Sequence, residues 1–157
     1  IKTSLKNQEY LESLGLKPLP VFHFFDIVNG HKEMFDEFIK NYEYVAIGGI
    51  ANIKISPENK QRYLDFVFSR TKDKVKVHGF GITTKKELER YPFYSVDSTS
   101  WLSFSRFANS KVNSKKMSIV KAKKRHYIEN TKEEIDYWIG FEKHITRLWD
   151  NRGVKWE

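Results

Sequence analysis

One acidic side chain stands among hydroxyls near the end of a short apolar run. Asp97 lies in the run 93–98, with Ser95 before it and Ser98 directly after it. Hydroxyls beside a carboxylate can orient it and stabilise its charge by hydrogen bonding. A carboxylate held in this way can act as a nucleophile, a general base or a metal ligand. The alternative is an aspartate that caps the following turn. Asp97 is the first candidate for a catalytic residue.

Glycines stand in two earlier apolar runs. Gly48 and Gly49 lie in the run 44–50, while Gly79 and Gly81 flank Phe80 in the run 75–82. A strand end without side chains lets a planar ligand or a phosphate approach the backbone, although the same glycines suit a tight turn. The third glycine and the following helix of a dinucleotide-binding fingerprint are absent. The pattern therefore indicates close approach to the backbone without predicting a dinucleotide.

Two histidines also lie inside apolar runs. His23 falls in the run 21–25 and His78 in the run 75–82. Together with Asp97 they could form a metal site of two imidazoles and one carboxylate, as in a metal-dependent hydrolase. The alternative, which we favour, is that each histidine is a core residue bonded to a neighbour. We therefore expect no metal and no cofactor.

The segment 106–125 is strongly basic. It holds eight basic side chains and no acidic one, with Trp101, Phe104 and Phe107 nearby in the sequence. Basic side chains interleaved with rings suit the phosphates and bases of a nucleic acid, whereas a solvated basic loop is the alternative. The formal net charge of +8 agrees with a nucleic-acid partner. The basic residues are Arg106, Lys111, Lys115, Lys116, Lys121, Lys123, Lys124 and Arg125.

The elements that must position these residues alternate between helix and strand. Helical spacing occurs over 4–14, 31–42, 56–70 and 84–90, and strands are expected at 21–25, 44–50, 75–82 and 93–98. Strands separated by helices predict right-handed crossovers and a parallel sheet. The fold class is therefore α/β, with βα repeats that belong to a TIM-type (βα)8 barrel or to an open sheet. Either fold brings the carboxyl ends of the strands to one edge.

The rest of the chain adds a short strand at 118–121 and a C-terminal helix at 131–150, opened by a capping box at 131–134. No linker divides the 157 residues, so we expect a single domain. The absence of cysteine excludes disulfides and thiolate metal sites and suits a reducing compartment. No run reaches the roughly 20 apolar residues that span a bilayer, and the opening residues do not resemble a signal peptide. We expect a cytoplasmic protein that does not bind membranes.

Three of these motifs, taken in order, resemble the tRNA-guanine transglycosylase family, and its phage-encoded members most of all. They are Gly48-Gly49 at a strand end, His78-Gly79-Phe80-Gly81, and Ser95-Val96-Asp97-Ser98. The segments 18–23 and 148–156 are similar to parts of the same group. The resemblance implies that this chain holds the later half of an eight-stranded βα barrel. It would then pair with a second copy or with the earlier half, in the host cytoplasm if it is phage-encoded.

The resemblance also implies an activity. In that family a strand-end aspartate, here Asp97, displaces guanine from a nucleic acid and holds the sugar covalently until a 7-deazaguanine base replaces it. A second aspartate on an early strand acts as general acid/base, and no position here matches it. The tRNA-modifying members carry a cysteine-rich zinc module that is absent here, which counts against tRNA and leaves DNA as the substrate or a non-catalytic role on the same scaffold. The expected substrate-binding residues are Gly48, Gly49, His78, Gly79, Phe80, Ser98 and Trp101.

Overall fold

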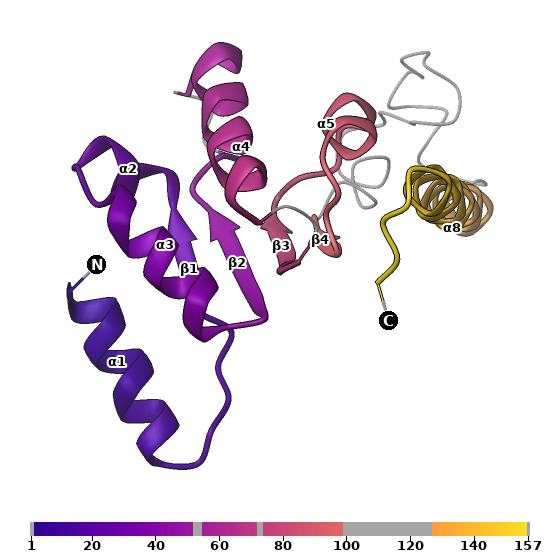
Figure 1. Ribbon diagram of the computed structural model, residues 1–157. Helices are drawn as coiled ribbons and strands as arrows, with labels where there is room; N and C mark the ends of the chain where they lie inside the picture. The colour runs from indigo at the N-terminus through magenta and orange to yellow at the C-terminus, as the bar shows by residue number, and fades with distance from the viewer. Residues whose placement is uncertain (1, 52–54, 72–73, 99–126, 157) are drawn as a thin grey trace. The chain divides into compact units, whose positions relative to one another are not determined.

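The computed structural model describes residues 2–51, 55–71, 74–98 and 127–156 (Figure 1). They fall into two compact units. The first unit comprises residues 1–97 with Trp156 and holds the sheet, and the second contains the C-terminal helix. The expected single domain stays a prediction.

The first unit is built on a four-stranded parallel sheet (Figure 1). Its strands are β1 (Val21–His23), β2 (Tyr44–Gly48), β3 (Lys76–Phe80) and β4 (Ser95–Asp97), and they lie in the order β1-β2-β3-β4. The register pairs Ala46 with His78 and His78 with Ser95. The predicted α/β class with parallel βα repeats is therefore confirmed.

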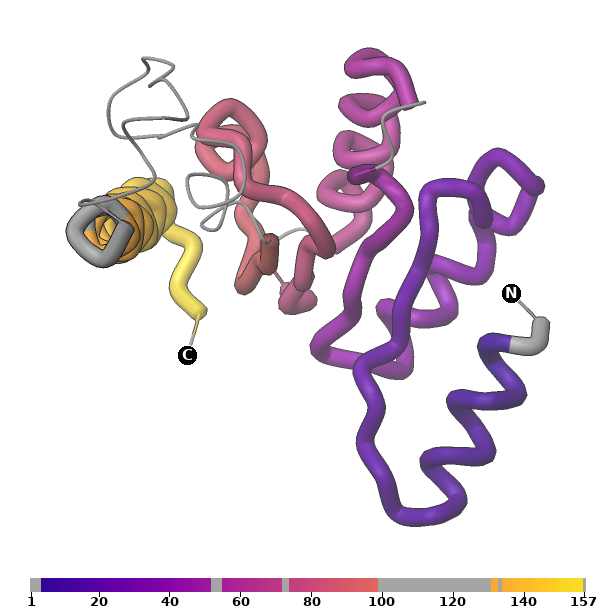
Figure 2. Tube along the Cα trace, turned by 180° about the vertical axis from the view of Figure 1, so that it is seen from behind, coloured from indigo at the N-terminus to yellow at the C-terminus, as the bar shows by residue number. Residues whose placement is uncertain are grey.

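Helices precede the first strand and connect each strand to the next. They are α1 (Lys2–Ser13), α2 (Phe24–Val28), α3 (Lys32–Asn41), α4 (Pro57–Thr71) and α5 (Lys85–Arg90). In Figures 1 and 2 the chain leaves α1 through a turn and rises into β1. The predicted start of α4 is confirmed, because Ser56 Oγ accepts a hydrogen bond of 3.3 Å from the backbone N–H of Asn59.

The end of β1 differs from the sequence prediction. A strand was expected to continue to Phe25 and a loop to follow, but the strand ends at His23 and α2 begins at Phe24. The reason is Asp26, whose Oδ2 accepts a hydrogen bond of 2.8 Å from the backbone N–H of His23. An acidic side chain that satisfies a backbone donor at this point favours the first turn of a helix over a longer strand.

The other three strands are also shorter than expected, with β4 limited to Ser95–Asp97, and in β2 and β3 glycines turn the chain away. Gly49 has φ +78° and Gly81 has φ +69°, so β2 ends at Gly48 and β3 ends at Phe80. The left-handed region carries little cost for glycine and a steric cost for other residues. These two turns lie at the edge of the sheet where Asp97 also ends its strand.

The two faces of the sheet differ in character, because successive side chains of a strand point to opposite sides. The face we call the helix face carries apolar residues that pack against the helices. Phe22 contacts Phe35 of α3 at 5.0 Å between ring centroids, and Tyr63 of α4 donates a hydrogen bond of 2.9 Å to the carbonyl of Phe22. Burial raises the pKa of Tyr63 and keeps its hydroxyl protonated for this bond. The helix face comprises Phe22, Val45, Ile47, Val77, Gly79 and Val96.

The opposite face, which we call the site face, carries mostly polar or small residues. Along β3 the half-buried Lys76 and His78 alternate with the buried Val77 and Gly79. The site face comprises Val21, His23, Tyr44, Ala46, Gly48, Lys76, His78, Phe80, Ser95 and Asp97. The sheet is thus two-sided, with the core beneath one face and chemically capable side chains on the other.

The second unit contains α8 (Tyr127–Asn151), which includes every residue at which the C-terminal helix was expected. It begins earlier, at Tyr127, so the capping box expected to open it at 131–134 is wrong and these residues lie inside the helix. Gly153 follows the helix with φ +85°, as a C-terminal glycine typically does. Among the helices that the structure describes, none combines the length and the apolar character that crossing a bilayer requires. The expected strand at 118–121 lies outside the described residues.

Candidate active site at the carboxyl edge of the sheet

Asp97 ends β4 on the site face with its carboxylate directed to solvent. Its side chain is 60% exposed, and its Oδ1 accepts a hydrogen bond of 2.9 Å from the backbone N–H of Gly81. Gly81 has a positive φ and turns the chain away from β3 directly after this donor. A Cβ on Gly81 would lie 2.7 Å from the Cβ of Ala51, so the turn has no room for a larger residue. The strand end therefore holds one carboxylate oxygen and leaves the group accessible.

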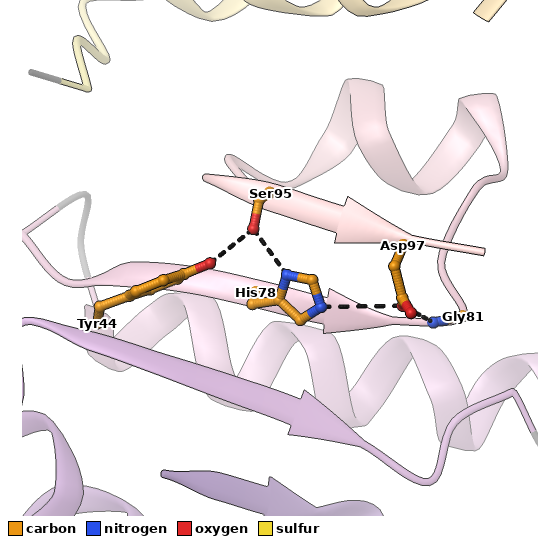
Figure 3. A network of polar contacts seen from close by, with 5 residues as sticks. All are labelled: Tyr44, His78, Gly81, Ser95 and Asp97. Atoms are coloured by element: carbon orange, nitrogen blue, oxygen red, sulfur yellow. Dashed lines mark hydrogen bonds and ion pairs between the residues drawn. The ribbon is translucent and has the colours of Figure 1, made fainter. Parts of the chain in front are cut away.

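His78 lies beside this carboxylate in a chain of polar contacts (Figure 3). Its Nε2 is 3.8 Å from Asp97 Oδ1, and its Nδ1 is 2.7 Å from Ser95 Oγ. Ser95 Oγ lies in turn 2.7 Å from the hydroxyl of Tyr44. The side chain of His78 is only 15% exposed and its ring packs against Phe80 at 4.6 Å between centroids, so the imidazole has a fixed position.

The rings of His23 and Phe80 lie over the buried Gly48 in the same row of the sheet. A Cβ built on Gly48 would lie 3.2 Å from the ring of His23 and 3.6 Å from the ring of Phe80. The His23 ring is oriented in part by Asp26, whose Oδ2 lies 3.9 Å from its Nδ1. The closeness of these rings favours glycine at this position, and a flat ligand edge could reach the Gly48 backbone once the exposed His23 ring moves aside. This place is separated from Asp97 only by Phe80, because the register pairs Phe80 with Asp97.

The other expected binding residues are distributed differently. Gly49 turns the chain at the end of β2, and Ser98 is half-buried just beyond β4. Gly79 lies on the helix face, where its Cβ position is 2.7 Å from the ring of Phe93 and 2.8 Å from Ile82. Its lack of a side chain is thus explained by core packing. Trp101 and the eight basic residues of 106–125 lie outside the described residues.

The three residues proposed for a metal site do not assemble into one. Among the described residues, no group of three or more histidine, cysteine, aspartate or glutamate side chains is placed to hold a metal ion. His78 lies near Asp97, whereas the ion-pair partner of His23 is Asp26. The metal-dependent hydrolase therefore lacks its ligand set in the part of the chain that the structure describes.

No sequence motif indicated a role for Tyr44, and Gly81, which was expected to let a ligand approach the backbone, instead donates its N–H to Asp97. Ser95 was expected to orient Asp97, yet its hydroxyl bonds His78. The period of two along β4 puts Ser95 and Asp97 on one face, and this signal was available in the sequence. The positions of Tyr44 and Gly81 relative to the site depend on the register between strands, and no local sequence pattern predicts that register.

The order Ser95–His78–Asp97 contains the residue types of a nucleophilic serine triad, but the exposure is reversed. Ser95 lies at the half-buried end between Tyr44 and His78, and the exposed end is the carboxylate of Asp97. A substrate arriving at this edge would meet the carboxylate first. The arrangement therefore fits carboxylate chemistry better than attack by a serine hydroxyl.

Comparison of the chain with protein-family models, with curated proteins and with solved structures gave no match.

Proposed function

We propose that this chain is a transglycosylase that exchanges guanine for a 7-deazaguanine base in a nucleic acid. The observation that carries the proposal is the exposed Asp97 carboxylate, held through Oδ1 by the N–H of Gly81 and placed in the same row as Gly48 and the two rings beside it. The motif order that resembles the tRNA-guanine transglycosylases supports the same assignment.

Asp97 acts as the nucleophile. Its carboxylate attacks the anomeric carbon of the target guanosine, the bond from that carbon to the base nitrogen breaks, and the bonding electrons leave with guanine, which takes up a proton. The incoming 7-deazaguanine then attacks the same carbon and loses a proton, and the carbon–oxygen bond to Asp97 breaks. Division into two displacements lowers the barrier of a difficult substitution.

Gly48 and the rings beside it form the base slot. A flipped-out purine needs a narrow space with flat walls, and the rings of His23 and Phe80, which lie over the buried Gly48, would form these walls once the exposed His23 ring moves aside. Backbone groups at a side-chain-free strand end can read the polar edge of a base without steric hindrance. The slot lies on β2 and the nucleophile on β4, in the same row with Phe80 of β3 between them, so a bound nucleotide would extend past the Phe80 ring to contact both.

The sheet order supports a barrel as the parent fold. In a sheet that adds each new strand beside the last, right-handed crossovers place successive helices on the same face. The sheet of this chain follows this rule, because its strands lie in sequence order and both α3 and α4 pack on the helix face. We propose that the four strands are consecutive strands of a (βα)8 barrel whose remaining strands come from a second copy or from an earlier half.

A base-exchange assay tests the function. The chain is incubated with tRNA or with duplex DNA and a radiolabelled 7-deazaguanine base, and label in the polymer is counted. We expect incorporation by the wild type and none by Asp97→Asn, with Asp36→Asn as the control. Asp36 forms its ion pair with Arg70. Full incorporation by Asp97→Asn would overturn the proposal.

Nucleic-acid binding without exchange is the second candidate function. It is favoured by the net charge of +8 and by the eight basic residues of 106–125. It predicts binding to DNA or tRNA by a chain that leaves the bases unchanged. The exchange assay separates the two, because a binding protein would give no incorporation with either polymer.

A further inference from the structure

The site contains a line of polar side chains that the proposed chemistry does not use. The hydroxyl of Tyr44 lies 2.7 Å from Ser95 Oγ, which lies 2.7 Å from His78 Nδ1. The opposite nitrogen of the same ring, Nε2, lies 3.8 Å from Oδ1 of Asp97 (Figure 3). Three strands contribute to this line, since Tyr44 comes from β2, His78 from β3 and Ser95 from β4. Polar side chains positioned across three strands require a reason beyond surface solvation.

Two arrangements of protons are compatible with the short contacts of a neutral histidine. In the first, Tyr44 donates to Ser95 and Ser95 donates to Nδ1 of His78, so the ring proton is on Nε2. In the second, Nδ1–H donates to Ser95, and Nε2 presents a lone pair. The two neutral tautomers differ only in which nitrogen carries the proton.

Asp97 selects between these arrangements. A lone pair on Nε2 would face Oδ1 of an ionised carboxylate across 3.8 Å, which is repulsive, whereas an N–H at the same place is attracted to it. The separation exceeds a hydrogen bond, so the interaction in this conformation is electrostatic. The first arrangement therefore satisfies each polar atom in the line, from the Tyr44 hydroxyl to the carboxylate.

We infer that Asp97, together with the hydroxyls of Tyr44 and Ser95, fixes His78 as its Nε2–H tautomer, which makes His78 a positioning residue for Asp97. The N–H of Gly81 and Nε2–H of His78 both act on Oδ1, so among the described residues the contacts to the carboxylate leave Oδ2 as the oxygen directed at the substrate. The effect of this arrangement on the reaction rests on the proposed function, whereas the tautomer itself does not.

Nitrogen NMR of the full chain measures the tautomer without any substrate. The protein is labelled with ¹⁵N-histidine, and the His78 signals are identified by their loss in His78→Gln. At pH 8, where an ordinary histidine is neutral, we expect the Nε2–H pattern for His78 in the wild type. Either an Nδ1–H pattern, an averaged mixture or a cation at that pH would overturn the inference.

Variants of the line provide the matched comparison. Ser95→Ala removes the donor to Nδ1, and we expect the single tautomer to become a mixture. Ser95→Thr retains a hydroxyl and should restore it. Ser69→Ala removes a hydroxyl that donates to the Phe66 carbonyl in α4, and should leave the His78 signals unchanged. If Ser95→Ala leaves the tautomer unchanged, Ser95 is not the group that fixes it and the inference fails.

The catalytic consequence is measured as the rate of covalent adduct formation at saturating nucleic acid. We expect Ser95→Ala to slow it about tenfold, the effect of one lost hydrogen bond, and Ser95→Thr to recover most of the rate. A changed tautomer with an unchanged rate would refute the positioning role while leaving the transglycosylase intact. A wild type that keeps the Nε2–H tautomer but forms no adduct would refute the transglycosylase alone.

Discussion

The backbone N–H of Gly81 donates a hydrogen bond of 2.9 Å to Oδ1 of Asp97. This contact joins the turn after β3 to the end of β4, and Gly81 makes it from the left-handed region of φ. A carboxylate that is bonded through one oxygen and exposed through the rest is suited to attack an electrophile outside the sheet. The contact therefore connects a local steric requirement with the proposed chemistry.

Gly81→Ala should damage both stability and activity. Alanine at φ +69° is strained by about 1–2 kcal/mol, and its Cβ would also lie 2.7 Å from the Cβ of Ala51. The turn must shift, which moves the donor away from Asp97. We expect a larger loss in the free energy of unfolding than strain alone gives, together with slower adduct formation.

Gly15→Ala is the control for Gly81→Ala. Gly15 has φ +78° and its Cβ position has no neighbour within 4 Å, so it carries the same strain without the clash. It should lower the free energy of unfolding by about 1–2 kcal/mol and leave adduct formation unchanged. Equal losses of stability and activity in the two variants would contradict the role given to the Gly81 turn.

Gly79 on the helix face and Gly48 on the site face should respond differently to replacement by alanine. Gly79→Ala places a methyl group 2.7 Å from the Phe93 ring on the helix face, and overpacking of a core costs about 1–3 kcal/mol. Gly48→Ala places one 3.2 Å from the His23 ring on the site face, where the exposed side chain of His23 can move. We expect Gly48→Ala to melt near the wild-type temperature and to bind a free 7-deazaguanine base at least tenfold more weakly by calorimetry.

Unchanged base binding in Gly48→Ala would remove Gly48 from the base slot. Gly79→Ala serves as the comparison. Measured below its melting temperature, where it is folded, this variant should bind the free base with the wild-type affinity. The reverse pattern, with the affinity lost in Gly79→Ala alone, would place the slot on the other side of the sheet.

The sequence predicts much of this fold because its signals are local. Helical periodicity and apolar runs place most helices and strands, and the period of two within β4 puts Ser95 and Asp97 on one face. The extension of β1 through Phe25 is wrong because a short-range bond between Asp26 and the backbone of His23 outweighs the apolar character of the run. Here side-chain chemistry at a single residue decides between strand and helix.

The site could be predicted only in part, because its contacts join residues that are distant in sequence. Asp97 and the Gly48 strand end are visible as local motifs, whereas the bond between Tyr44 and Ser95 depends on the register of three strands. Gly79 and Gly81 look alike in the sequence, yet one faces the core and the other forms a turn. A one-residue change in register would exchange these roles.

Tyr91 should make the stability of the chain depend on pH in the alkaline range. Burial, assisted by the hydrogen bond of 2.7 Å to Asp65, raises the pKa of Tyr91 from 10.0 to about 12. The unfolded chain therefore loses this proton first, and the free energy of unfolding falls as the pH rises from about 10 to about 12. Chemical denaturation at several pH values measures the slope.

Tyr91→Phe should have a smaller slope over that interval than the wild type. The buried Tyr63 adds to the same trend, so the test is the difference between the two proteins and not the slope itself. Tyr10→Phe is the control, because the side chain of Tyr10 is exposed and its removal should leave the slope unchanged. Identical slopes for wild type and Tyr91→Phe would refute the raised pKa.

The basic segment should control how salt affects nucleic-acid binding. Each phosphate contact contributes a slope of about −0.7 to −0.9 in a plot of log affinity against log salt, because counterions are released. Replacing four basic residues by glutamine should therefore reduce the slope by up to about 3. The residues to replace are Lys121, Lys123, Lys124 and Arg125.

A second fourfold variant controls for net charge in this experiment. It replaces exposed lysines of the first unit, and its salt slope should match that of the wild type. The residues are Lys6, Lys17, Lys32 and Lys40. If both variants reduce the slope equally, overall charge and not the segment 106–125 determines binding.

Mass spectrometry of a covalent intermediate tests the central claim most directly. The full chain is mixed with tRNA or duplex DNA in the absence of an incoming base, quenched by denaturation, digested with nuclease and protease, and mapped. The account predicts a sugar adduct on the peptide that contains Asp97, and no adduct in Asp97→Asn. An adduct on another residue, an adduct that persists in Asp97→Asn, or none with either polymer would contradict it.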